Sequence, residues 1–168
     1  MKKLWCSPHK PLPEQGEGFF MLGDVNPELQ QRLNNTSAEV KELYALAKEL
    51  LEFAQRGKFD LFQPGGSPAF QFILGNLASN SPIRIFYAHS ERVSVEKTLP
   101  DGRVEKTSVF KHRGWICLGG RVTLQSDPHC NLPQVGEIQE YLGYRMKVTE
   151  VWGGYEGLPN EIILERAD

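Results

Sequence analysis

The chain has 168 residues, of which 40% are hydrophobic and 24% are charged. This length provides for one well-filled core and a small appendage, and it excludes a long multidomain enzyme. Nineteen basic and 21 acidic residues give a net charge of −2, which argues against a protein that coats duplex nucleic acid through its overall charge. Any polyanion must therefore bind locally.

The cysteines indicate the cellular compartment. Cys6, Cys117 and Cys130 are too few and too scattered for a disulfide framework, and none belongs to a CxxC pair. We therefore expect a reducing, cytoplasmic location. The chain reaches Pro8 before an apolar run of signal-peptide length could form, and no later segment approaches 18 apolar residues, so we expect neither secretion nor a membrane partner.

Short apolar runs alternate with helical periodicity over the first 88 residues, and this alternation is typical of βα units that build a parallel sheet. The predicted strands are residues 4–6, 18–22, 59–63 and 83–88. Between them, Asn26 and Ser67 each precede a proline and are predicted to cap helices. Thr36 and Glu39 fit a capping box for an amphipathic helix that ends near Gly57. The helix after Ser67 is apolar on nearly all sides, so we expect it to be buried in the domain or against a second subunit.

From Arg92 onward the hydrophobic period changes from 3.6 to 2. Alternating residues on both sides of the Leu99–Gly102 turn predict a β-hairpin, and short strand-like runs between glycines predict a small all-β tail. The resulting expectation is an α/β fold with a mostly parallel sheet and flanking helices, a β-hairpin extension and a small all-β C-terminal appendage. We divide the chain into a nucleotide-binding domain, residues 1–115, and the appendage, residues 116–168.

Charge follows the same division. Residues 89–113 contain six basic and four acidic residues, a local charge of +2, whereas residues 127–168 contain three basic and eight acidic residues, a local charge of −5. An anionic ligand should prefer the hairpin. The aromatic residues of the tail, Tyr144 among them, are interpreted either as its core or as an interaction surface.

In an open α/β sheet, ligands bind outside the carboxyl ends of the parallel strands. Three loops are expected there, and they contain Ser7 with His9, Gly65–Ser67, and His89 with Ser90 and Arg92. Two glycines followed by a helix-capping serine make a phosphate-sized nest, although an ordinary tight turn explains the same residues. His9 is either an exposed loop residue or part of the site. His89 is a candidate acid or base because it is an imidazole at the end of a strand, where titratable groups are often functional.

Two other kinds of site have little support. Asp127, His129 and Cys130 lack the paired spacing of a zinc site, and a polar turn explains them better, so we expect no metal and no cofactor. A serine hydrolase with Ser67 as its nucleophile is also poorly supported, because Ser67 does not lie in a GxSxG motif.

The residues of these loops resemble a known family. The segments that carry the resemblance are Ser7-Pro8-His9, Gln63-Pro64-Gly65-Gly66-Ser67, the run from Phe86 to Glu96, an Asp-Gly turn, and the run from Lys106 to His112. Residues 3–115 resemble the small Rossmann-like CRISPR-associated Csx proteins, which belong with the CARF-type domains and several of which are ring nucleases. The resemblance does not extend over the tail.

This resemblance implies a Rossmann-like homodimer that binds a cyclic oligoadenylate, cyclic tetra-adenylate first among them, and opens its ring without a metal through attack of a ribose 2′-OH. Gly65, Gly66 and Ser67 would hold phosphate, together with Ser7, His9 and Ser90. Arg92 or Lys106 would offset developing negative charge, and His89 or His9 would act as acid or base. Such a protein would switch off type III CRISPR signalling.

Two alternatives remain open at this point. The domain could be a sensor or sponge that binds a cyclic nucleotide without cleaving it. It could also be a dimeric scaffold whose acidic, aromatic tail binds another protein, in which case it would have no nucleotide affinity.

Overall fold

The computed structural model describes residues 2–100, 102–126, 131–152 and 159–167. Within these residues, eight strands form one mixed sheet in the order β2-β1-β3-β4-β5-β8-β7-β6. Their bounds are β1 Lys2–Trp5, β2 Phe19–Met21, β3 Phe59–Phe62, β4 Ser81–Thr98, β5 Val104–Ser126, β6 Ile138–Tyr141, β7 Tyr144–Trp152 and β8 Asn160–Arg166.

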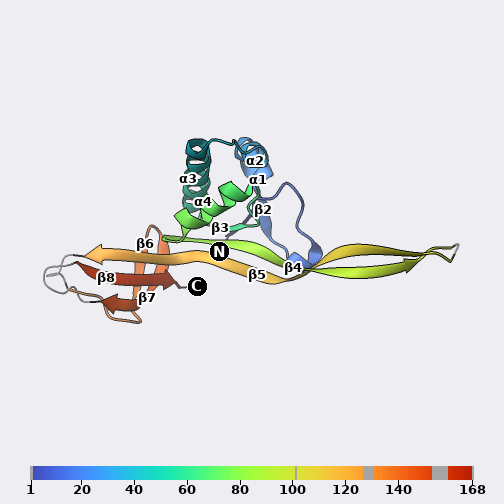
Figure 1. Ribbon diagram of the computed structural model, residues 1–168. Coiled ribbons are helices and arrows are strands. Elements are labelled where there is room, and N and C mark those ends of the chain that lie inside the picture. The colour runs from blue at the N-terminus through green and yellow to red at the C-terminus, as the bar shows by residue number, and fades with distance from the viewer. Residues whose placement is uncertain (1, 101, 127–130, 153–158, 168) are drawn as a thin grey trace.

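The first four strands are parallel, and the α-helices lie on one face of them (Figure 1). The helices are η1 Pro13–Gln15, α1 Leu22–Val25, α2 Pro27–Asn34, α3 Val40–Gly57 and α4 Pro68–Ala78. Alternation along the strands turns Leu4, Leu61 and Ile85 into the main core, where all three are fully buried. None of the helices in the described part of the chain is long and apolar enough to cross a membrane.

The helix starts follow two of the three predicted caps. The side chains of Asn26 and Ser67 accept hydrogen bonds from the amides of Leu29 and Phe70 and begin α2 and α4, as predicted. The predicted capping box of α3 is wrong, because Glu39 takes the N-cap position without a side-chain bond. The hydroxyl of Thr36 instead accepts a hydrogen bond from the Ser67 amide.

Helix α4 is less buried than its composition predicted. Phe70, Ile73, Leu74 and Ala78 are buried, but Phe72 is 77% exposed on the opposite side.

The predicted hairpin is confirmed and is longer than expected. β4 and β5 pair in antiparallel register from Ser81–Arg121 to Thr98–Val104. Beyond a bulge at His89 and Ser90 the pair leaves the body of the molecule as a two-stranded arm, residues 89–113 (Figure 1). β8, β7 and β6 add to the other side of β5, at the opposite end of the molecule from the tip of the arm.

The predicted α/β fold with a mostly parallel, Rossmann-like sheet is therefore wrong. The βα alternation is real, but it builds only the edge β2-β1-β3-β4, and every later strand pairs antiparallel. β5 continues from the arm into pairing with β8, so the tail strands extend the same sheet and do not form an appendage with its own sheet. The α-helices cover one face of the parallel part of the sheet, whereas a doubly wound fold covers both faces.

Candidate functional site

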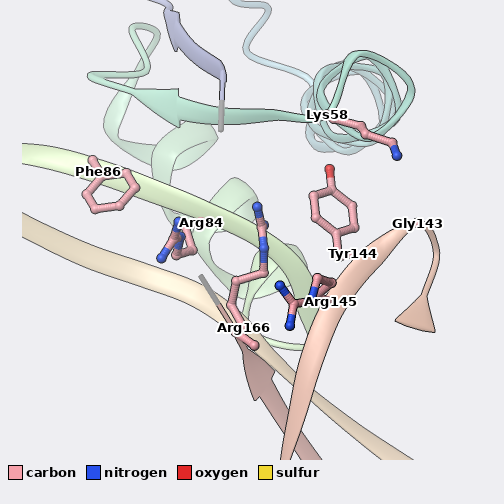
Figure 2. A pocket seen from close by; sticks show the side chains of 8 residues that line it. Lys58, Arg84, Phe86, Gly143, Tyr144, Arg145 and Arg166 are labelled. Carbon is pink, nitrogen blue, oxygen red and sulfur yellow. The ribbon is translucent and has the colours of Figure 1, made fainter. Parts of the chain in front are cut away.

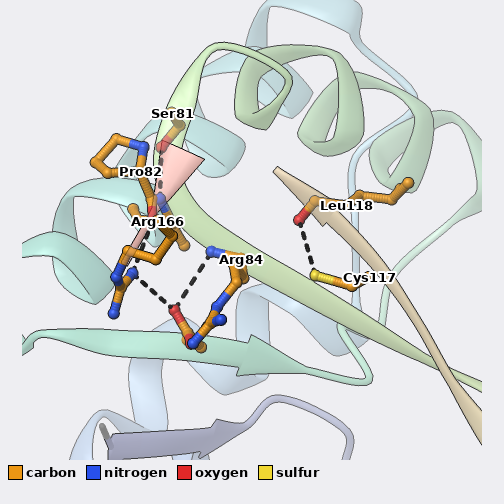
Figure 3. Close-up of polar contacts among 8 residues, drawn as sticks. Ser81, Pro82, Arg84, Cys117, Leu118 and Arg166 are labelled. Carbon is orange, nitrogen blue, oxygen red and sulfur yellow. Dashed lines mark hydrogen bonds and ion pairs between the residues drawn. The ribbon is translucent and has the colours of Figure 1, made fainter. Parts of the chain in front are cut away.

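A buried carboxylate lies under the face of the sheet that the helices leave uncovered. Asp60 is the second residue of β3 and its side chain is fully buried. It accepts hydrogen bonds from the Arg84 amide at 3.3 Å, from Arg84 Nε at 3.0 Å and from Arg166 Nη1 at 3.3 Å. Arg166 also donates to the carbonyl oxygen of Pro82 at 2.8 Å (Figure 3). This network connects β8 to β3 and β4.

A cavity of about 500 Å³ opens above this network, and we call it the basic pocket. Its lining is Lys58, Arg84, Phe86, Gly143, Tyr144, Arg145, Arg166 and Ala167. Four of these residues are cationic and none is acidic. In the described contacts, the carboxylate that pairs with two of these cations, Arg84 and Arg166, is Asp60 beneath the floor of the pocket. Figure 2 shows the three arginines arranged around the cavity, with the Tyr144 hydroxyl directed toward Lys58. The arrangement suits an anion.

Tyr144 contributes a polar group that has no partner within the described residues. Its side chain is 3% exposed, its ring lies 4.2 Å from the Arg166 guanidinium, and its buried hydroxyl makes no hydrogen bond. Burial raises the pKa of this hydroxyl, the Arg166 charge lowers it and the Asp60 charge raises it. The group therefore stays protonated at neutral pH and can donate to a ligand.

Two left-handed residues shape the rim of the basic pocket. Lys58 ends α3 with φ 53° and lies in the position that glycine usually takes, while its amide satisfies the carbonyls of Ala54 and Gln55. Leu142, with φ 50°, makes the two-residue turn with Gly143 between β6 and β7. A side-chain carbon added to Gly143 would lie 3.7 Å from Lys58 Nζ. Non-glycine residues held in this conformation store strain, which is often found at binding sites.

The predicted loops at the carboxyl ends of β1 and β3 do come together. A side chain at Gly65 would lie 3.5 Å from the Cys6 carbonyl oxygen, next to the loop that holds Ser7 and His9. Both of these residues make local bonds, since the Ser7 hydroxyl accepts from the His9 amide and the His9 carbonyl accepts from Trp5 Nε1.

The Gly65–Ser67 turn uses its polar groups inside the chain. The Ser67 amide donates to Thr36, the Ser67 hydroxyl accepts from Phe70, and the Gly66 carbonyl accepts from Gln71 Nε2 at 3.5 Å. With φ 94° and the Phe70 ring against it, Gly66 has no room for a side chain. The described contacts fit a tight turn with a serine cap.

The remaining candidates lie at increasing distance along the arm. His89 and Ser90 are exposed at its base, next to Ala88, whose amide donates to Gln63. Arg92 is exposed and lies opposite Phe110 in the register of β4 and β5. Lys106 forms an ion pair with Glu96 at 2.8 Å, about 26 Å along β4 from Ala88. The structure therefore does not bring Lys106 to the Gly65–Ser67 turn.

Asp127, His129 and Cys130, which lack the spacing of a zinc site, all lie outside the described residues. In the ranges that the structure describes, no three His, Cys, Asp or Glu side chains lie together as a metal site would require.

Sequence reasoning missed the cations of the basic pocket because they come from four separate segments. A signal was available in two of the strands. Asp60 interrupts the apolar run from Phe59 to Phe62, and Arg84 stands between two isoleucines. Opposite charges inside neighbouring apolar strands indicate a buried ion pair. Nothing local marks Arg145 or Arg166.

Comparison with known proteins finds one family. No curated protein and no solved structure matches the chain. The uncharacterized protein MJ1673 family matches residues 1–116, more than two thirds of the length, which includes Lys58, Asp60, Arg84 and Phe86. The pocket residues from β7 and β8 lie beyond the matched region. The chain therefore belongs to the uncharacterized protein MJ1673 family.

Proposed function

We propose that this protein binds a small phosphate-bearing ligand of the nucleotide class in the basic pocket. One observation carries the proposal: among the described residues, four cationic side chains and no acidic one line the cavity. Asp60 is shared between Arg84 and Arg166, and the described contacts give Lys58 and Arg145 no acidic partner. Phosphate is the common biological anion that arginine and lysine recognise in this manner.

The other lining residues favour a nucleotide over inorganic phosphate. The cavity of about 500 Å³ is in the range of small-molecule sites and exceeds the needs of one phosphate group. The Phe86 ring provides an apolar surface beside the Arg84 guanidinium, at 5.7 Å. The unpartnered Tyr144 hydroxyl offers a hydrogen-bond donor. A planar base together with a phosphate would use all three features.

Cyclic oligoadenylate belongs to this ligand class, and the resemblance of residues 3–115 to CARF-type proteins makes cyclic tetra-adenylate the first ring to test. A ring of repeated nucleotides would be held by a two-fold dimer that presents the pocket twice. Ring opening by His89, Ser67 and Arg92 is the further expectation of the resemblance. These residues lie outside the basic pocket, so the geometry supports binding more directly than cleavage. A cytoplasmic location, where such ligands occur, is part of the same proposal.

Calorimetry with AMP, cyclic tetra-adenylate and inorganic phosphate tests the proposal. We expect Lys58→Gln and Arg145→Gln each to weaken nucleotide binding at least about fivefold, because each removes a charge-assisted contact. Arg56→Gln and Lys147→Gln are matched controls, since each removes a nearby cation that does not line the pocket. Chromatography of the ligand after incubation with EDTA separates cleavage from sequestration.

The outcomes are distinct. Binding without linear product identifies a sensor or sponge, and binding with product identifies a ring nuclease. No binding of any nucleotide, or equal losses in test and control variants, refutes the proposed site and favours a scaffold.

A further inference from the structure

The face of the sheet opposite the helices continues from the basic pocket toward the arm. Phe86 lines the pocket. The following residues on the same face of β4 are Ala88, Ser90 and Arg92, and their partners on β5 are Trp115, His112 and Phe110 in that order. Ring contacts place Phe86, Trp115 and His112 on one face, and Phe110 follows from the strand register. Phe62 stacks on Phe86 at 4.5 Å and contacts Trp115 at 5.1 Å, and His112 lies 4.9 Å from Trp115. We call Phe86, Trp115, His112 and Phe110 the aromatic row.

The far end of this row is open to a partner. Phe110 is 69% exposed, and the exposed Arg92 lies directly opposite it on β4. Nδ1 of His112 is buried without a hydrogen-bond partner among the described residues. An exposed phenylalanine and an unsatisfied imidazole on a two-stranded arm are both stabilised by an added ligand.

We propose that a single-stranded oligonucleotide of a few residues binds along the aromatic row, with its terminal phosphate in the basic pocket. This inference rests on the proposed function, because the pocket supplies the phosphate anchor. The row extends about 20 Å from Phe86 to the Arg92–Phe110 pair, at the usual rise per strand residue. A mononucleotide would leave most of this length unused.

The order of side chains fits single-stranded nucleic acid. Cations lie at both ends of the row, Arg84 at the pocket and Arg92 on the arm, with aromatic rings between them. Proteins bind single strands by stacking bases on aromatic side chains while cations follow the phosphates. A duplex would meet a protein with a net charge of −2 and hide its bases.

The test measures binding of 5′-phosphorylated linear tetra-adenylate by fluorescence polarisation, with AMP and 5′-hydroxyl tetra-adenylate as competitors. We expect the phosphorylated tetranucleotide to bind at least about tenfold more tightly than either competitor. Phe110→Ala should weaken tetranucleotide binding about tenfold and leave AMP binding unchanged. Val109→Ala is the matched control, because Val109 is the neighbouring exposed apolar residue on the other face of the arm.

The results separate this inference from the proposed function. If AMP and the tetranucleotide bind equally well, or if Phe110→Ala and Val109→Ala behave alike, the aromatic row is refuted while the pocket stands. If neither ligand binds, the proposed function itself fails. If cyclic tetra-adenylate binds more tightly than the linear form, the linear-strand inference is overturned.

Discussion

Asp60→Asn should destabilise the fold while it tightens anion binding. Asp60 is fully buried and accepts three hydrogen bonds from Arg84 and Arg166. The substitution keeps the shape of the side chain and removes the negative charge that Arg84 and Arg166 share beneath the basic pocket. The free energy of unfolding and the ligand dissociation constant should therefore both fall, which is an unusual pair of effects for one variant.

The size of the stability loss follows from the burial of the partners. Breaking a buried ion pair by removing one partner costs about 3–5 kcal/mol. The side chains of Arg84 and Arg166 are 14% and 12% exposed, so water reaches them partly, and asparagine keeps one acceptor oxygen. We therefore expect a loss of about 2–3 kcal/mol, which lowers the melting temperature of a chain of this size by roughly 4–12 °C.

Urea unfolding and calorimetry with AMP measure the two effects on the same samples. Asp24→Asn is the control, because Asp24 is an exposed carboxylate on α1. The expected gain in AMP affinity is several-fold and should diminish at high salt. A variant as stable as the wild type would refute the buried ion pair. Weaker AMP binding by a folded variant would show that Asp60 positions the arginines for the ligand, contrary to the electrostatic argument.

Three further variants test the backbone and the core. Gly119→Ala should cost about 3 kcal/mol or more in urea unfolding, because φ is 80° and the new carbon would lie 2.3 Å from the Ile83 carbonyl oxygen; a loss below about 1 kcal/mol would contradict this geometry. Leu142→Asn should stabilise by about 0.5–1 kcal/mol, since asparagine tolerates the left-handed turn, and a destabilised variant would argue against it. Burial raises the pKa of the Cys6 thiol, so the unfolded thiol loses its proton first. The free energy of unfolding should then fall by up to about 1.4 kcal/mol per pH unit above roughly pH 8.5, and Cys6→Ala should reduce that slope in unfolding curves from pH 7 to 10.

Local signals in the sequence predicted the local structure well. The caps at Asn26 and Ser67 and the end of α3 near Gly57 depend on contacts within a few residues, and the sequence contains those contacts. The Thr36 capping box failed because a tertiary partner competed for the hydroxyl. The Ser67 amide, 31 positions away, takes the hydrogen bond that a local cap would have made.

The class of the sheet could not be predicted in the same way, because strand pairing is not local. The run from Ile83 to Ala88 has the apolar character of a buried parallel strand, and Ile85 and Phe86 do pair with β3. The same strand then continues as one side of the arm, so β4 is parallel on one edge and antiparallel on the other. Period-2 alternation predicts a strand but does not indicate which strand it will pair with.

The position of the basic pocket shows why the charge of a segment is a poor guide to where an anion binds. The tail has a local charge of −5, and on that basis it should repel anions. Two of its three cations, Arg145 and Arg166, nevertheless line the cavity, while Glu150 and Glu165 form ion pairs with Arg121 elsewhere on the sheet. Coulomb energies fall with distance and are screened by water over about 10 Å, so the field at a site reflects the few nearest charges. Strand register, which brings β8 beside β5 and its Arg166 onto Asp60 of β3, therefore determines which charges line the pocket.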